Sequence, residues 1–234
     1  MGKSKTSDFK MLDDVTNTEP ELDSFTALLV QGLAAEEKIY GQVFTTLFIK
    51  NALNYVAKKF GEKQPEDIKT LSQLREYIIT LTEKHHTAYH AFIYAQFKTE
   101  NELQGQTGAG ARIGSIEAYK HTEKKPNVEE QNVDLDNIIS TYRQTTIAMK
   151  VATREFGYKK NTDGSVDIIL PMCYSTDVCQ YIFEEGLLKR PDGRLRCTRA
   201  FGISQFFKLA TNHDWDYDLL ETFKPYCMIR IYPV

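Results

Sequence analysis

Apolar residues recur every three to four positions through most of the first 150 residues, a spacing that places them on one face of an α-helix. The first such segment begins after Pro20 and ends at Gly61, a residue typical of helix C-termini. Gly32 and Gly41 are the positions at which it can divide. The pattern therefore predicts either a helical hairpin or one long helix.

A second helical pattern starts at Pro65, where carboxylates follow in the first turn. Its apolar stripe runs to Leu81, and the pattern continues through an aromatic-rich stretch to Phe97. A third helix is predicted from Asp134 to about Glu155. The chain up to this point is therefore mainly helical.

The end of the third helix has an alternative. The sequence Asn161–Gly164 is a strong turn signal, because Asn, Asp and Gly tolerate the backbone angles of tight turns. Residues 151–158 can therefore form a strand that pairs with residues 166–170 instead of continuing the helix.

Period-two alternation dominates the last third of the chain. Residues 166–170 and 228–232 read as strands, as do residues 215–223. Short helices are predicted between them, from Thr176 or Asp177 to Glu185 and from about Ile203 to Asn212. We expect an α+β fold: a helical N-terminal two-thirds packed on a small, mainly antiparallel C-terminal sheet.

The domain organisation follows from these patterns. Residues 1–17 are polar and are predicted to be a disordered tail. Residues 18–234 are predicted to form one domain, helical over 18–156 and containing all four cysteines in an α+β unit over 157–234.

Composition excludes two classes of partner. The net charge of −3 gives no basic excess for nucleic acid, and no apolar run is long enough to span a bilayer. The N-terminus is charged but has no apolar segment typical of a secretory signal. We therefore expect a cytoplasmic protein. Long aromatic-rich helices leave apolar faces that one sheet covers incompletely, so a homo-oligomer is also expected.

The four cysteines lie in the last third of the chain, at Cys173, Cys179, Cys197 and Cys227. In a protein without a secretory signal they are expected to be thiols. Cys173, Cys197 and Cys227 are candidate ligands for a divalent metal ion if the predicted strands bring them together. The alternative is that each is a small buried apolar residue.

Two histidines and a glycine-rich stretch add further candidates. His86 and His90 are four residues apart, so on one helix they would share a face and could bind one metal ion. The alternative is that these histidines are exposed, or are buried in the core with hydrogen-bond partners. Tyr89 beside them is a candidate ligand-binding residue. Downstream, the glycine-rich stretch forms either an anion cradle or a flexible lid; its candidate ligand-binding residues are Gly108, Gly110 and Arg112.

Candidate catalytic residues lie in the C-terminal unit. Cys173 is a candidate nucleophile with His213 as its base. Glu184, or its neighbour Glu185, is a candidate ligand or proton carrier, although residues on a short helix are more often solvated. We expect the pocket between the cysteine-bearing unit and residues 85–112.

Four pieces of the chain together resemble the L-2-amino-thiazoline-4-carboxylate hydrolase-like family: Val166–Cys173, Cys197, the helix end at Ala210–Asn212 and the stretch Tyr226–Ile231. They resemble the vinyl-4-reductase, or hydrocarbon-binding, domain more distantly. The likeness implies a small-molecule pocket bordered by cysteines, which some relatives use to hold a metal. Two departures are the short turn at 223–225 in place of a Gly-Asp element, and Tyr174 in place of a proline after the first cysteine.

Three functional classes follow. The first is a hydrolase-like enzyme that acts on a small carbon–nitrogen substrate such as a heterocycle, at a cysteine-bordered pocket. The second is a non-catalytic binding or sensor module for an apolar or aromatic small ligand, favoured by the 13 Phe and 13 Tyr. The third is a scaffold in which the cysteines belong only to the core.

Overall fold

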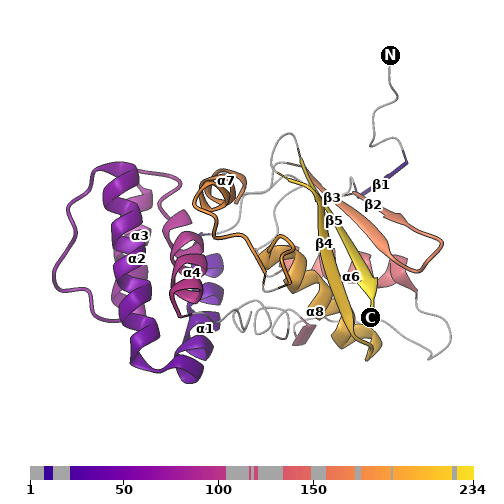
Figure 1. Cartoon of the computed structure of the whole chain (residues 1–234), viewed down its shortest axis with the longest axis horizontal. Helices are drawn as coiled ribbons and strands as arrows, with labels where there is room; N and C mark the ends of the chain where they lie inside the picture. Colours follow the sequence, from indigo (N-terminus) through magenta and orange to yellow (C-terminus); the bar gives the residue numbers. More distant parts are fainter. Residues whose placement is uncertain are drawn as a thin grey trace, which may run out of the picture.

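Two hydrophobic cores organise the molecule, one inside a helical bundle and one beneath a β-sheet (Figure 1). The computed structural model describes residues 8–12, 22–103, 116, 119–120, 134–148, 157–171, 175–190, 192–222 and 226–234. Within these residues there are seven helices and one five-stranded antiparallel sheet, which confirms the predicted α+β class.

The bundle begins with a helical hairpin rather than one long helix. Helix α1 (Leu22–Tyr40) and helix α2 (Gln42–Phe60) are separated by Gly41, whose φ of 71° is in the left-handed region that favours glycine. Gly32 stays inside α1. Gly61 ends α2, as predicted, also with a positive φ.

Helix α3 (Leu71–Thr82) begins six residues later than Pro65, so the predicted start was wrong. The reason is a capping box. The Gln73 backbone N–H donates to Thr70 Oγ1 at 3.2 Å, and the Thr70 N–H donates to Gln73 Oε1 at 3.1 Å. This reciprocal pair fixes the helix start at Leu71 more strongly than a proline in the preceding segment does.

The helical pattern predicted to continue from α3 into the aromatic stretch is interrupted in the structure. After α3 the chain turns through residues 83–89, and helix α4 (His90–Glu102) starts at His90. His86 therefore lies in the turn and His90 in the helix. The expectation that both share one helical face was wrong.

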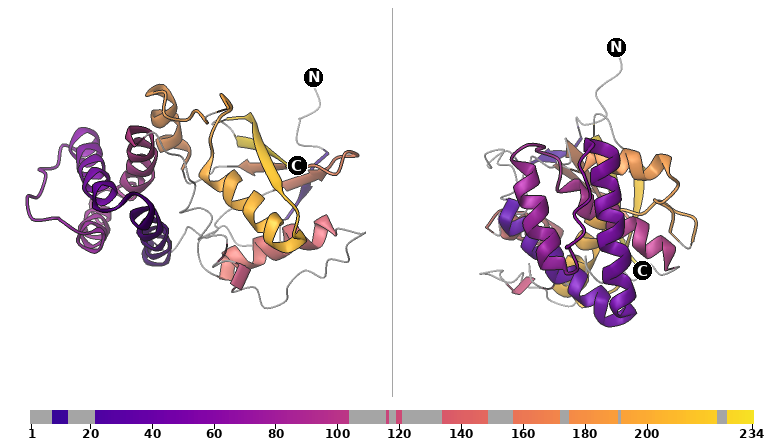
Figure 2. Two further views of the ribbon diagram at one scale, coloured as in Figure 1. Left: turned by 60° about the horizontal axis from the view of Figure 1, so that its bottom comes forward. Right: turned by 90° about the vertical axis from the view of Figure 1, so that its left-hand side faces the viewer.

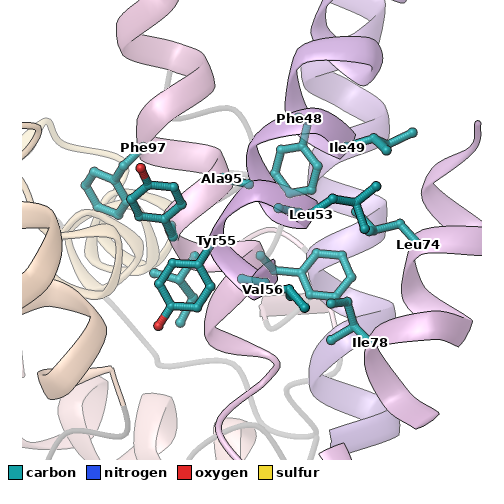
Figure 3. Close-up of a cluster of buried hydrophobic side chains, with 14 of the residues drawn as sticks. Phe48, Ile49, Leu53, Tyr55, Val56, Leu74, Ile78, Ala95 and Phe97 are labelled. Atoms are coloured by element: carbon teal, nitrogen blue, oxygen red, sulfur yellow. The ribbon is translucent and has the colours of Figure 1, made fainter. Parts of the chain in front are cut away.

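The first core lies between these helices. In Figure 3, Leu53 of α2 points toward Leu74 of α3, whereas Tyr55 on the opposite side of α2 points away from α3. Tyr55 instead stacks on Tyr94 of α4, with ring centroids 5.0 Å apart. Helix α2 is therefore buried on both sides, which explains why its apolar positions occupy more than one stripe.

The second core lies on one face of the sheet. The strand order is β1 (Lys10–Met11), β2 (Gly157–Lys160), β3 (Val166–Pro171), β5 (Tyr226–Pro233) and β4 (Trp215–Glu221). Alternate residues of β3, namely Val166, Ile168 and Leu170, pack against helix α6 (Leu135–Ala148) and helix α8 (Thr198–Thr211). The predicted alternation of apolar and polar residues therefore arises because helices cover this face of the sheet.

The turn at Asn161–Gly164 joins β2 to β3 as the sequence predicted. Gly164 has a φ of 82°, and the Asn161 N–H donates to the Ser165 carbonyl at 2.9 Å. The strand alternative is therefore right for Gly157 and Tyr158. The helical end expected near Glu155 lies outside the described residues.

The predicted N-terminal tail contributes to the sheet. Strand β1 pairs with β2, with Lys10 opposite Tyr158 and Met11 opposite Gly157. The Met11 sulfur lies where a Cβ atom at position 157 would be, so a larger residue there would require the Met11 side chain to shift. Strand β1 therefore lies within the segment 1–17.

Helix α7 (Thr176–Glu184) belongs to the bundle core, although it lies between β3 and α8 in the sequence. Val178, Ile182, Leu187 and Leu188 are buried in the first core. Figures 1 and 2 show α7 beside α4, on the side of the bundle nearest the sheet. The chain thus leaves the sheet, inserts one helix into the bundle and returns to form α8.

None of the described helices has a stretch long and apolar enough to cross a lipid bilayer.

The position of α7 leads to a prediction about cooperativity. Ile182 is 0% exposed in the bundle core, so Ile182→Ala should lower the free energy of unfolding by about 2–5 kcal/mol. Trp215, the single tryptophan, lies in the sheet core and reports on it by fluorescence. Urea unfolding should show the same shift by far-UV circular dichroism and by Trp215 fluorescence, because α7 joins the two cores.

Phe183→Ala is the matched control, since Phe183 is on the same helix but is 46% exposed. This variant should lower the free energy of unfolding by less than about 1 kcal/mol. A shift in the dichroism transition with an unchanged fluorescence transition would contradict the prediction.

Candidate functional site

The predicted site residues separate into those the structure places and those it does not. Cys173 and the three glycine-rich-stretch residues lie outside the described residues; the latter are Gly108, Gly110 and Arg112. Their predicted roles stay predictions. The remaining candidates lie in three places: the start of α4, the end of α7, and the ends of α8 and β5.

At the start of α4, the two histidines point to different environments. His86 is exposed in the turn, whereas His90 is buried and its ring lies 4.6 Å from that of Tyr89. Among the described residues there is no group of three His, Cys, Asp or Glu side chains placed to hold a metal ion. The predicted metal ligands therefore stay a prediction, and no chemistry is assigned to a metal.

At the end of α7, Glu185 rather than Glu184 makes the specific contacts. Glu184 is exposed and accepts a hydrogen bond from Gln180, at 3.3 Å. Glu185 Oε2 accepts a hydrogen bond from the Tyr94 hydroxyl at 2.8 Å, and Lys58 lies 3.4 Å from Oε1. Burial acts to raise the pKa of Glu185, but the tyrosine and lysine hydrogen bonds hold it below its usual value.

Glu185 is part of a tyrosine cluster that sequence reasoning missed. Tyr181 of α7 lies 5.8 Å from Tyr55 and 5.6 Å from Tyr94 between ring centroids, and Lys58 stacks over its ring. Burial raises the pKa of Tyr55 to about 12, and the neighbouring Tyr181 acts in the same direction. The Tyr55 hydroxyl therefore stays protonated at neutral pH. The cluster attaches α7 to α2 and α4.

Cys197 is the N-cap of α8. Its Sγ accepts a hydrogen bond from the Ala200 backbone N–H at 3.4 Å, and its own N–H donates to the Tyr217 hydroxyl at 3.2 Å. Ser, Thr, Asp or Asn usually occupies this position, because an oxygen is the stronger acceptor. A cysteine in the same place puts a thiol at the positive end of a helix dipole.

Two arginines lie around Tyr217. The Arg190 guanidinium stacks over the Tyr217 ring, 4.8 Å from its centroid, and donates to the Tyr217 carbonyl at 3.1 Å. Burial raises the pKa of the Tyr217 hydroxyl, whereas the nearby charges of Arg190 and Arg196 act in the opposite direction. We name Cys197, Tyr217, Arg190 and Arg196 together the Cys197 site.

Arg196 reaches from this site into the bundle. It is 8% exposed, forms an ion pair through Nη2 with Oε2 of the fully buried Glu100 on α4, and lies 4.6 Å above the Phe97 ring. Gln96 donates to the other Glu100 oxygen at 3.1 Å. Burial lowers the pKa of Arg196 to about 10, with the charges of Tyr217 and Glu36 opposing it, so it is cationic at neutral pH.

The loop that carries Arg190 is fixed to the edge strand β4. Arg190 pairs with Asp216 at 3.0 Å, and Arg194 pairs with Asp216 at 2.6 Å and with Asp218 at 2.9 Å. Burial acts to raise the pKa of Asp216, but the hydrogen bonds from Arg190 and Arg194 lower it to about 2. This network holds the loop in the position that Arg190 needs to cover Tyr217.

The sheet register places Cys227 near the exit of β3. Cys227 is opposite Leu170, and the neighbouring pair is Tyr226 with Pro171, the last described residue before Cys173. Cys197 and Cys227 both pack at the margin of the sheet core. Helix α8 ends at Thr211, whose hydroxyl accepts a hydrogen bond from Trp215 Nε1 at 2.8 Å, so this end of the helix lies beside the start of β4.

His213 is exposed and lies beyond the other end of α8. A helix of 14 residues is about 21 Å long, so His213 and Cys197 are too far apart to form a catalytic pair. Trp215 is opposite Pro233, at the far end of β5 from Cys227. The predicted pairing of His213 with Cys173 stays a prediction, because Cys173 is outside the described residues.

No protein-family model, curated protein or solved structure matches the chain significantly.

The Asp216 network yields a prediction with a definite pH dependence. The folded-state pKa of Asp216 is depressed, so the charged carboxylate stabilises the folded protein fully above the unfolded-state pKa of about 3.9. This stabilisation is lost as the pH falls through about 2. Asp216→Asn should therefore lower the free energy of unfolding by about 2 kcal/mol at pH 7. The difference from the native protein should be the same at about pH 5 and smaller at about pH 3.

Urea titrations at the three pH values measure this difference. Glu184→Gln removes an exposed carboxylate on α7 and should change stability by less than about 0.5 kcal/mol. An Asp216→Asn deficit that does not shrink at low pH would show that the arginine pairs do not stabilise the charged form.

Proposed function

We propose that the protein binds a small organic molecule at the end of the sheet where β3 ends and β5 and α8 begin. The observation that carries the proposal is the position of two thiols: Cys197 is the N-cap of α8, and Cys227 is opposite Leu170, near the end of β3. This agrees with the cysteine-bordered pocket implied by the family resemblance.

The chemistry of the surrounding residues supports an apolar or aromatic ligand with few polar groups. Cys197, Phe201, Leu219 and Cys227 are partly buried at the margin of the sheet core. Phe201 and Tyr217 form an edge-to-face pair, with centroids 6.4 Å apart. Apolar walls with a few placed polar groups are typical of small-molecule sites. A binding or sensor module is therefore the function we favour.

Hydrolase-like turnover of a small carbon–nitrogen substrate is the second candidate, favoured by the placement of a thiol at a helix N-terminus. In that reaction the thiolate adds to the carbon of the C–N bond, which breaks with its electron pair moving to nitrogen. The nitrogen takes a proton from solvent. Water then displaces the thiol from carbon and regenerates it.

Two further proposals concern the setting of the protein. Cys179, Cys197 and Cys227 are thiols rather than disulfides, which supports a reducing compartment such as the cytoplasm.

Ile39 and Val43 are 56% and 51% exposed at the α1–α2 turn, which supports a homo-oligomer. A monomer by light scattering at micromolar concentration would contradict the second.

The ligand proposal is tested with 2-amino-thiazoline-4-carboxylate as the probe. Binding at a hundred times Kd should stabilise the native protein by about 2.7 kcal/mol, seen as a rise in Tm. Cys227→Ala should reduce that rise, whereas Cys179→Ala, on α7 and away from the sheet core, should leave it unchanged. Mass spectrometry of the recovered probe separates the two candidates, since only an enzyme cleaves it.

A panel of small aromatic amides and heterocyclic amines extends the test beyond this probe. A Tm that no member of the panel raises, or a rise that Cys227→Ala and Cys179→Ala reduce equally, would contradict the proposed site.

A further inference from the structure

Strand β4 is at one end of the sheet, so its backbone pairs with another strand on one side, that of β5. Just before β4, the Val234 N–H donates to the Asp214 carbonyl at 2.9 Å. In an antiparallel pair, hydrogen-bonded positions alternate with positions whose backbone groups point away from the partner strand. The positions at which β4 directs its backbone outward are therefore Trp215, Tyr217 and Leu219.

Tyr217 is the middle one of these outward positions, and side chains occupy both of its outward backbone groups. Its N–H donates to Asp216 Oδ1 at 2.8 Å. Its carbonyl accepts hydrogen bonds from Nη1 of Arg190 at 3.1 Å and from Nη1 of Arg194 at 3.4 Å. The outward groups of an edge strand are otherwise a template for another strand. An added strand therefore cannot form an unbroken ladder along β4.

Both arginines belong to one tight turn, residues 188–190 and 192–196, which we name the edge cap. The Arg196 N–H donates to the Leu188 carbonyl at 2.7 Å, and the Arg190 N–H donates to the Arg194 carbonyl at 2.8 Å. Gly193, with a φ of 83°, supplies the positive backbone angle at the tip. The edge cap is therefore fixed by its own backbone hydrogen bonds, and it brings two guanidinium groups to one carbonyl of β4.

Strand β4 has a composition that favours pairing. Its sequence contains Trp215 and Tyr217, and aromatic residues are enriched in strands. Leu220, at the irregularity near the end of the strand, is 40% exposed. Uncovered apolar edge strands pair readily with strands of other chains. The edge cap therefore covers a strand that would otherwise be suited to association.

We propose that the edge cap prevents a second copy of this chain from adding its own β4 to the sheet. The partner that fits this edge is another β4, because a strand can pair antiparallel with its own copy about a two-fold axis. With that axis at Tyr217, Asp216 of one copy would face Asp218 of the other. Like charges directly opposite each other destabilise a strand pair, so these carboxylates act in the same direction as the cap. The proposed small-molecule site has no part in this inference.

An uncapped variant of the full-length protein combines Arg190→Ala, Arg194→Ala and Asp216→Ala. These changes remove both donors to the Tyr217 carbonyl, the acceptor of its N–H and one of the two facing carboxylates. Light scattering at micromolar concentration should give at least about twice the mass of the native protein. An unchanged mass, in a variant that retains the native far-UV circular dichroism, would overturn the proposal.

The matched control combines Asp167→Ala and Arg230→Ala. These residues form an ion pair, with 2.6 Å between Arg230 Nε and Asp167 Oδ1, on β3 and β5, which both have a neighbouring strand on each side. The control should keep the native mass, because no strand edge is uncovered. An equal increase in mass in the control and in the uncapped variant would contradict the role of the edge cap.

A fourth change in the uncapped variant locates the association. Leu220→Lys should restore the native mass, because lysine on an edge strand opposes pairing with another chain. A mass that is the same with and without this change would place the contact elsewhere on the molecule and overturn the proposal.

Hydrogen exchange in the native protein tests the cap independently of whether the uncapped variant folds. The Tyr217 N–H points away from β5, so its protection depends on Asp216 and the edge cap. This amide should exchange at least about tenfold more slowly than in the unfolded chain. Exchange of the Tyr217 amide at the unfolded-chain rate would show that the edge is open and would overturn the proposal.

Discussion

The buried ion pair between Arg196 and Glu100 is the interaction on which the arrangement of the two cores depends. Glu100 belongs to α4 in the bundle, and Arg196 immediately precedes the N-cap of α8 in the sheet unit. Removing two charges from water is costly, and losing either partner would leave the other buried and unpaired. The stacking of Arg196 on Phe97 and the Gln96 hydrogen bond to Glu100 complete the arrangement.

Helix α7 also connects the two cores, through apolar contacts. Its buried residues Val178 and Ile182 belong to the bundle core, while the segments before and after it belong to the sheet. The loop back to α8 is fixed by Arg190 and Arg194 on the carboxylates of β4. The Cys197 site therefore lies where a return crossing from the bundle meets the sheet, and its geometry depends on both units.

Local signals explain how much of the fold could be predicted from the sequence. The turn at Asn161–Gly164 and the stop at Gly61 were predicted because these residues favour tight turns and helix ends whatever surrounds them. The start of α3 was misplaced because the capping box of Thr70 and Gln73 outweighed the proline signal. The break before His90 was missed because the apolar spacing continues across it.

The long-range contacts of the candidate site could not be predicted in the same way. No pattern near Glu185 indicates Tyr94, and none near Arg196 indicates Glu100, since these partners are about 90 residues apart in the chain. Cys197 was identified as a functional candidate, but its capping role was not. Cysteine is an uncommon N-cap residue, and the helix start depends on Tyr217 across the core.

A double-mutant cycle on Arg196 and Glu100 tests most directly whether this pair joins the two cores. Each single change, Arg196→Met or Glu100→Gln, should lower the free energy of unfolding by about 3–5 kcal/mol, because it leaves a buried charge or polar group unpaired. The double variant should lose at least about 1 kcal/mol less than the sum of the two. If each single variant lowered the free energy of unfolding by less than about 1 kcal/mol and the two losses simply added, the pair would not join the two cores.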